Sequence, residues 1–177
     1  MRRFSAASGS ALFFAVAPGV VAGLVPWWLT GWRVGYSWWL PLRVVGGVLA
    51  AAGVVVLVSA FVRFVVEGAG TPAPVASTER LVVGGLYRYV RNPMYLAVLA
   101  AILGQAMLLA QPVLVGYAVP AGAAMVTFVL GYEQPALARR YGAQYAAYRA
   151  AVPGWWPRLR PWRGGSDVPG STRQPAG

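Results

Sequence analysis

The sequence predicts an all-α integral membrane protein with about four transmembrane helices, from its composition and the length of its apolar runs. Of the 177 residues, 58% are hydrophobic and 11% are charged, whereas soluble domains carry about 25% charged residues. The apolar runs are about as long as a helix must be to cross a hydrocarbon core of ~30 Å. An ordinary soluble domain is therefore not expected.

The first apolar run covers residues 11–30 and follows Arg2 and Arg3. Its prolines and the pair Trp27 and Trp28 favour an interfacial membrane helix over a cleaved signal peptide. Residues 31–41 are rich in tryptophan and tyrosine, which is typical of an aromatic belt at a membrane surface.

Three further runs complete the predicted bundle, at residues 42–66, 94–110 and 113–130. Small residues in the second run, Gly46, Gly47 and Gly53, would let another helix approach closely. Pro93 suits the first position of the third helix, and Gln111-Pro112 forms a turn so short that the third and fourth helices are expected to be antiparallel. Pro120 is expected to interrupt the fourth run.

Residues 133–152 predict an amphipathic helix that lies along the membrane or closes over the bundle. Its apolar and aromatic residues recur every three or four positions, at Leu137, Tyr141, Tyr145, Tyr148 and Val152. Pro153 ends this helix. An interfacial clamp of aromatic and cationic residues is expected next, made of Trp155, Trp156, Arg158, Arg160, Trp162 and Arg163.

The arginines predict the topology, since all 15 cationic residues are arginine and the net charge is +11. With four spans most of them fall on the side of the two termini, which the positive-inside rule places in the cytoplasm. We expect an N-terminal helix pair (residues 1–66), a catalytic region (67–163) that includes a polar loop, and a disordered tail (164–177).

The residue inventory restricts the chemistry. The chain has no cysteine and no histidine, and its acids are Glu67, Glu79, Glu133 and Asp167. Thiolate nucleophiles, Cys/His metal sites and histidine bases are excluded, and the apolar composition argues against a nucleic-acid partner. A cofactor is expected to supply the reactivity, with no metal.

Several polar residues are predicted to converge on the cytoplasmic face. Tyr87, Arg91, Asn92 and Tyr95 surround the start of the third span, where free helix N–H groups suit an anionic group. Glu133 ends the fourth span, and Arg91 is its expected partner. Taken singly, each has a plain structural explanation, such as a belt tyrosine or an arginine that binds lipid phosphate. Their convergence favours a functional site.

The segments LVVGGLYRYVRNPMYLAVLAAILGQ and YEQPALARRYGAQYAAYRAAVPGWWP resemble the isoprenylcysteine carboxyl methyltransferase and phospholipid methyltransferase superfamily of membrane enzymes. The resemblance covers residues 81–157. The family motif Arg-His-Pro-x-Tyr-x-Gly reads here with Asn92 for histidine and Ala97 for glycine, and Gln134 replaces the second acid of a Glu-Glu pair. Asn92 keeps hydrogen-bonding capacity but cannot titrate as histidine does.

The resemblance implies a cytoplasmic-side pocket for S-adenosylmethionine, covered by the C-terminal amphipathic helix. Tyrosine faces would stabilise its sulfonium by cation–π attraction. The residues implied to line the pocket are Leu81, Val82, Tyr87, Asn92, Pro93, Met94, Tyr95 and Glu133. Arg91 and Glu133 are the candidate catalytic residues, and Arg139 and Arg140 are candidates for binding an anionic acceptor.

The acceptor stays open. A prenylated cysteine carboxylate, a phosphatidylethanolamine nitrogen and another lipid-like molecule all fit a lipophilic substrate that enters from the bilayer. The arginine-only, alanine-rich composition favours a bacterial inner-membrane protein. Two other hypotheses remain: an NADPH-dependent enzyme of the steroid-reductase type, and a non-catalytic membrane lipid-binding protein.

Overall fold

The computed structural model describes residues 16–36, 39–68 and 81–163, with the side chains of 64–68 excepted. In these ranges every regular element is helical, which confirms the all-α prediction. In chain order the elements are η1 (Val20–Leu24, a π-helix), α2 (Val25–Thr30), α3 (Leu40–Gly68), η2 (Gly85–Arg88, a 3₁₀-helix), α4 (Pro93–Leu108), α5 (Pro112–Phe128), η3 (Val129–Glu133, a π-helix) and α6 (Gln134–Ala151).

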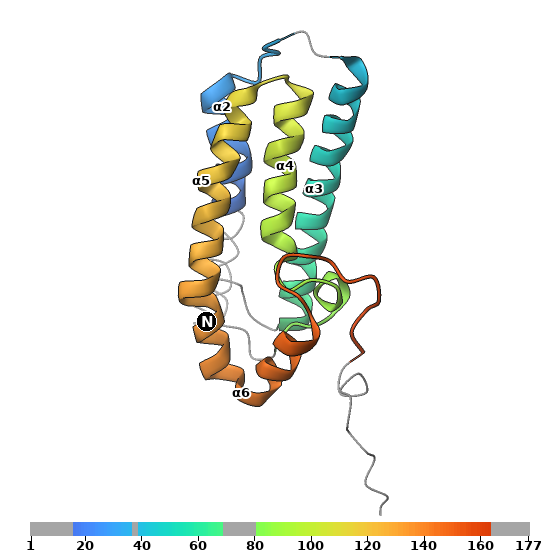
Figure 1. Ribbon diagram of the computed structural model, residues 1–177, viewed down its shortest axis with the longest axis vertical. Coiled ribbons are helices and arrows are strands. Elements are labelled where there is room, and N and C mark those ends of the chain that lie inside the picture. Colours follow the sequence, from blue (N-terminus) through green and yellow to red (C-terminus); the bar gives the residue numbers. More distant parts are fainter. Residues whose placement is uncertain (1–15, 37–38, 69–80, 164–177) are drawn as a thin grey trace, which may run out of the picture.

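The helices form an elongated bundle in which α3, α4 and α5 run side by side, with α2 beside α5 and α6 across one end (Figure 1). Two segments, Leu40–Arg63 and Pro112–Ala151, are long and apolar enough to cross a membrane, and Val16–Thr30 and Pro93–Leu108 are shorter apolar helices. The predicted antiparallel hairpin is confirmed, because α4 and α5 are joined by a short turn.

Helices α3 and α4 pack backbone against backbone through glycines. A Cβ atom added at Gly46 would lie 2.5 Å from the Leu108 nitrogen, and one at Gly53 would lie 2.8 Å from the Ala97 carbonyl oxygen. Small residues at such positions are what allow apolar helices to approach closely. The predicted close contact is confirmed at these two glycines, whereas a Cβ at Gly47 would make an ordinary contact at 3.5 Å.

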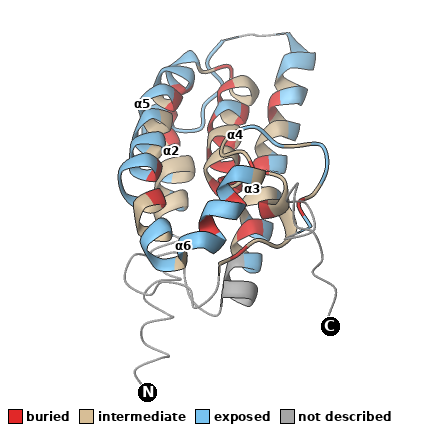
Figure 2. Cartoon of the chain, turned by 60° about the horizontal axis from the view of Figure 1, so that its bottom comes forward, coloured by how far each residue is buried: buried red, intermediate tan, exposed pale blue. Residues whose placement is uncertain are grey.

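Two polar side chains, one on α4 and one on α5, hold η1 to the bundle through hydrogen bonds. The Gln105 amide on α4 donates a 2.7 Å hydrogen bond to the Ala22 carbonyl, and the Tyr117 hydroxyl on α5 donates a 3.0 Å bond to the Val21 carbonyl. Both acceptors lie in η1. The buried residues in Figure 2 line the inner face of α4, and the outward faces of α3 and α5 are exposed.

Three expectations are corrected by the fold. Helix α5 continues through Pro120, because in apolar surroundings a broken helix would leave backbone groups unpaired. Helix α6 bends at Gly142, whose φ of 48° and ψ of −123° are not helical. Trp162 is 8% exposed and belongs to a core cluster, so it is not part of an interfacial clamp.

Some expectations concern residues outside the described ranges. They are the start of the first run with Arg2 and Arg3, the polar loop through residue 80, and the tail at 164–177. The proposed division into three regions also stays a prediction.

Candidate functional site

The site end of the bundle, as we call the end where α4 begins and α5 ends, brings most of the predicted site residues together. Val82, Tyr87 and Met94 lie in one buried cluster against Ala60 of α3. Leu81 points elsewhere and packs in the cluster around Tyr148. The 3₁₀ turn η2 places Tyr87, and it starts at Gly85, whose φ of 56° is in the region that favours glycine.

Asn92 caps the start of α4 in an unusual way. Pro93 occupies the first helical turn, yet the Asn92 side chain makes no capping hydrogen bond. The residue is 5% exposed, and its Nδ2 group has no hydrogen-bond partner within the described part of the chain. A buried unpaired donor costs roughly 1–3 kcal/mol. Such a group is a reason to look for a ligand at this position.

The loop after α6 holds the segment around Asn92. The backbone N–H groups of Arg91 and Asn92 donate to the carbonyls of Pro153 and Gly154, at 2.9 and 3.2 Å. A Cβ atom added at Gly154 would lie 3.3 Å from Nη2 of Arg91 and 3.5 Å from Nδ2 of Asn92. Gly154 therefore leaves the space beside the unpaired amide open.

Tyr95 and Glu133 join the start of α4 to the end of α5. The Tyr95 hydroxyl donates a 2.9 Å hydrogen bond to Oε2 of Glu133. Glu133 is the last residue of η3, and such π turns are frequent at functional sites. Trp155 also contacts Tyr95, with the two ring centroids 6.3 Å apart and the ring planes tilted by 46°.

Arg91 is not the hydrogen-bond partner of Glu133 that the sequence suggested. Its Nε donates to the Val152 carbonyl at 2.8 Å, and its Nη1 donates to the Tyr145 hydroxyl at 3.3 Å. The charge of Arg91 still acts on the Glu133 carboxylate from a greater distance. Arg91 bonds elsewhere because the Val152 carbonyl, at the end of α6, has no donor within the helix and accepts the Arg91 Nε–H group instead.

The tyrosine face predicted for α6 is buried, as expected. Tyr145, Tyr148, Val152 and Trp162 form a cluster against which Leu137 and Tyr141 pack. The Tyr148 hydroxyl donates a 2.7 Å hydrogen bond to the Tyr87 carbonyl, which fastens α6 to η2. The amphipathic helix thus closes over the site end of the bundle.

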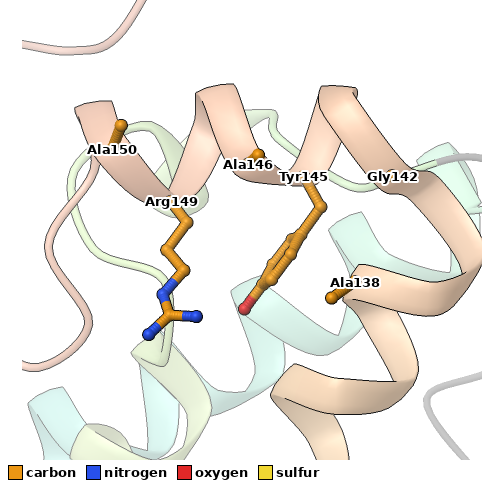
Figure 3. Close-up of a pocket in the computed structure, with 6 residues that line it drawn as sticks. All are labelled: Ala138, Gly142, Tyr145, Ala146, Arg149 and Ala150. Atoms are coloured by element: carbon orange, nitrogen blue, oxygen red, sulfur yellow. The ribbon is translucent and has the colours of Figure 1, made fainter.

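The bend in α6 forms an open surface hollow of about 370 Å³, and five of its six lining residues are exposed. The residues that line it are Ala138, Gly142, Tyr145, Ala146, Arg149 and Ala150, and Figure 3 shows Tyr145 and Arg149 pointing to the same side. The predicted acceptor residues Arg139 and Arg140 are exposed and do not line this hollow. Arg140 instead lies over the Tyr141 ring, 5.7 Å from its centroid.

Comparison with known protein families decides the identity at the level of family. Residues 42–144 match the model of phospholipid methyltransferases, and this is more than half of the 177 residues. The chain belongs to the phospholipid methyltransferase family. Neither the curated proteins nor the solved structures gave a match.

Membership in the phospholipid methyltransferase family confirms the resemblance and implies methyl transfer as the general activity. The matched range contains the Asn92–Tyr95 stretch and Glu133, and it ends before Tyr145 and Trp155.

Sequence reasoning missed part of the site. The sequence predicted Trp155 as part of an interfacial clamp and gave Gly154 no role, although both lie within the segment that resembles the family. The hollow on α6 had one available signal, Gly142 in the middle of a helical pattern.

Proposed function

We propose that this protein transfers a methyl group from S-adenosylmethionine to a lipophilic acceptor at the inner surface of a bacterial membrane. The observation that carries the proposal is the 2.9 Å hydrogen bond between Tyr95 and Glu133, beside the unpaired Asn92 amide. These groups lie at the start of α4 and the end of η3, both within residues 42–144, which match the family. The finer assignments below extend the family's general activity to this chain.

The residues at this place fit the cofactor. It combines a sulfonium cation with an amino-acid end, a ribose and an adenine ring, so it needs acceptors, donors and an aromatic face together. The buried Nδ2 of Asn92 is a donor to which residues 16–36, 39–68 and 81–163 supply no partner, and Gly154 leaves room beside it. The first N–H groups of α4 suit a carboxylate.

Tyr95 and Glu133 would recognise the charged and polar parts. The Glu133 carboxylate can accept a hydrogen bond from a hydroxyl or ammonium while it keeps the one from Tyr95. The Tyr95 ring can face a cation, an attraction on the order of 0.5–2 kcal/mol. The Trp155 ring lies beside it at an angle of 46° and adds a second aromatic surface to the site.

In this mechanism the protein aligns the cofactor methyl group with the acceptor, and acid–base chemistry is less important. When bound, S-adenosylmethionine supplies a methyl carbon that is already activated. Correct placement of two reactants can contribute roughly 7–11 kcal/mol, and the rigid start of α4 is suited to provide it. Arg91, fixed by Val152 and Tyr145, holds the loop that carries Gly154 and Trp155, so we assign it a positioning role.

The membrane placement follows from the apolar faces. Valines on α3 such as Val48, Val55 and Val62 are more than half exposed, which suits contact with lipid chains. We propose four spans with both termini in the cytoplasm, as the arginine distribution predicts. The lipophilic acceptor would then enter from the bilayer, and Arg139 and Arg140 would attract anionic lipids to the site end of the bundle.

The test is transfer of radiolabelled methyl from S-adenosylmethionine into lipid and protein fractions by the purified protein in nanodiscs. We expect label in the lipid fraction and a loss of roughly 100-fold or more for Glu133→Ala, because a partly buried carboxylate that can bind the cofactor is removed. Gln111→Ala, at the opposite end of the bundle, is the control and should retain activity.

Two results would count against the proposal. Wild-type protein that transfers no label, but binds NADPH, would support the reductase hypothesis instead. Equal transfer by wild type and Glu133→Ala, with both variants folded by circular dichroism, would remove Glu133 from the site.

A further inference from the structure

The hollow on the concave side of α6 is a second place where a ligand could bind. It exists because Gly142 bends the helix with a positive φ of 48°, so that Ala138 on one arm faces Tyr145 and Arg149 on the other (Figure 3). Its remaining walls are alanines, which leave the space open. No Cβ contact within 4 Å would oppose a side chain at Gly142, so crowding does not explain the bend.

The polar groups of the hollow are cationic and hydrogen-bonding. Arg149 is exposed and has no hydrogen-bond or ion-pair partner in the described part of the chain. Tyr145 is 3% exposed, and its hydroxyl receives a hydrogen bond from Arg91. A second guanidinium therefore lies behind the tyrosine that forms one wall.

The surroundings hold little negative charge to compensate these arginines. Glu133 is the one acid whose side chain is described, and its Oε2 is engaged by the Tyr95 hydroxyl. A phosphate is a suitable ligand for an arginine near a tyrosine hydroxyl. Its oxygens are strong acceptors, and a guanidinium can donate two parallel N–H hydrogen bonds to them.

We propose that this hollow binds a phosphate group of the methyl acceptor, with Arg149 as its direct ligand. The inference rests on the proposed function, because it deepens the assignment of the acceptor. A phosphate at Arg149 would be linked through Tyr145 and Arg91 to the Asn92–Tyr95 segment. Helix α6, whose residues line the hollow, lies at the end of the bundle where α4 begins and α5 ends (Figure 1). In the four-span topology this end lies at the level of the lipid headgroups.

A fluorine label can test this directly, because the chain has no cysteine. Ala146 lines the hollow and its neighbour Ala147 does not, although both are exposed. Ala146→Cys and Ala147→Cys would each carry a small trifluoromethyl tag, in a phosphate-free maltoside detergent. The ¹⁹F signal would be followed during titration with dihexanoyl phosphatidylethanolamine, dihexanoylglycerol or inorganic phosphate.

We expect the phospholipid to shift the signal at position 146 in a saturable way, with little change at position 147 and none from the phosphate-free glycerolipid. Arg149→Gln should weaken this binding at least about ten-fold, as expected for a charge-assisted hydrogen bond. Arg160→Gln removes the same charge from an exposed loop position and should leave the affinity unchanged. A response to inorganic phosphate as strong as that to the lipid would keep the phosphate site but assign it a soluble ligand.

Three results would overturn the inference: equal binding of dihexanoylglycerol, equal shifts at positions 146 and 147, or unchanged affinity in Arg149→Gln. In the last case a lower Tm would show that Arg149 serves only the helix end. Binding of S-adenosylhomocysteine by Arg149→Gln separates this proposal from the proposed function. If it binds normally while the phospholipid does not, both proposals stand; if even wild type fails to bind it, the cofactor assignment fails independently.

Discussion

The two ends of the bundle differ in their polar residues, although side chains bond to backbone carbonyls at both, as Arg91 and Tyr148 do at the site end. At the end away from the site, three such bonds are found. Nε of Arg43 donates to the Leu108 carbonyl at 3.0 Å, and the Gln111 amide donates to the Arg33 carbonyl at the same distance. The Thr30 hydroxyl donates to the Pro26 carbonyl at 2.7 Å. The Leu108 carbonyl is one of those that the end of α4 leaves open, whereas the Arg33 carbonyl lies in the loop after α2 and the Pro26 carbonyl lies inside α2.

At the site end several polar groups remain available. Tyr95 and Glu133 bond to one another, and the side-chain Nδ2 group of Asn92 has no hydrogen-bond partner among the described residues. Side-chain pairs of this kind can add or exchange partners without unfolding a helix end. The comparison teaches that substitutions at the far end should change stability, and that substitutions at the site end should change ligand binding and activity.

The largest effect is expected for Glu133→Gln. The amide keeps the shape and can still accept the Tyr95 hydrogen bond, but it has no charge. We expect methyl transfer to fall by roughly 100-fold, since a hydrogen bond to a charged group is worth about 1.5–3 kcal/mol. Thermal stability should change little. Unaltered kcat/KM would show that the carboxylate charge is not used.

A smaller loss is expected for Tyr95→Phe, which keeps the ring over which a cation can lie and removes the hydroxyl. We expect kcat/KM to fall about ten-fold because Glu133 loses its donor. Tyr117→Phe is the matched control, as its hydroxyl bonds to the Val21 carbonyl in the first helix. It should lower Tm without affecting activity, and a comparable activity loss in the control would break the distinction between the two regions.

Gly154→Ala tests the open space beside Asn92. The new methyl group would lie 3.3 Å from Nη2 of Arg91, which is a tight contact, and 3.5 Å from Nδ2 of Asn92, an ordinary contact that fills the space beside this group. We expect the affinity for S-adenosylhomocysteine to fall by several-fold to about ten-fold, with little change in Tm because the neighbouring side chains can shift. Unchanged affinity would place the ligand elsewhere.

The smallest effect on activity is expected for Arg43→Gln at the far end. It removes a hydrogen bond to the Leu108 carbonyl and should cost about 1 kcal/mol of stability, measured as a lower Tm in detergent. Methyl transfer should stay within about two-fold of wild type. A large loss of activity at unchanged Tm would mean that this end also takes part in function.

The sequence predicted the helices well because apolar length, proline at helix starts and a two-residue turn are local signals. Gly46 and Gly53 were also predicted correctly as close contacts, since a missing Cβ has one clear use between apolar helices. The bend at Gly142 and the continuity through Pro120 were not predicted. Both depend on what surrounds the residue, which a local pattern does not contain.

The site was predicted less completely for a related reason. The hairpin brings Tyr95 and Glu133 near each other, so their convergence could be inferred, but the choice of partner could not. Arg91 looked like the natural partner of Glu133 by charge. It bonds to Val152 and Tyr145 instead, because the chain after α6 returns to this place through contacts far apart in sequence.

Calorimetric binding of S-adenosylhomocysteine to the protein in nanodiscs tests the central claim most directly. Wild type should bind it and Arg43→Gln should bind it with the same Kd, whereas Asn92→Ala and Glu133→Gln should each bind at least about ten-fold more weakly. Wild-type protein that shows no binding, or four proteins with the same Kd, would contradict a cofactor site between the start of α4 and the end of η3.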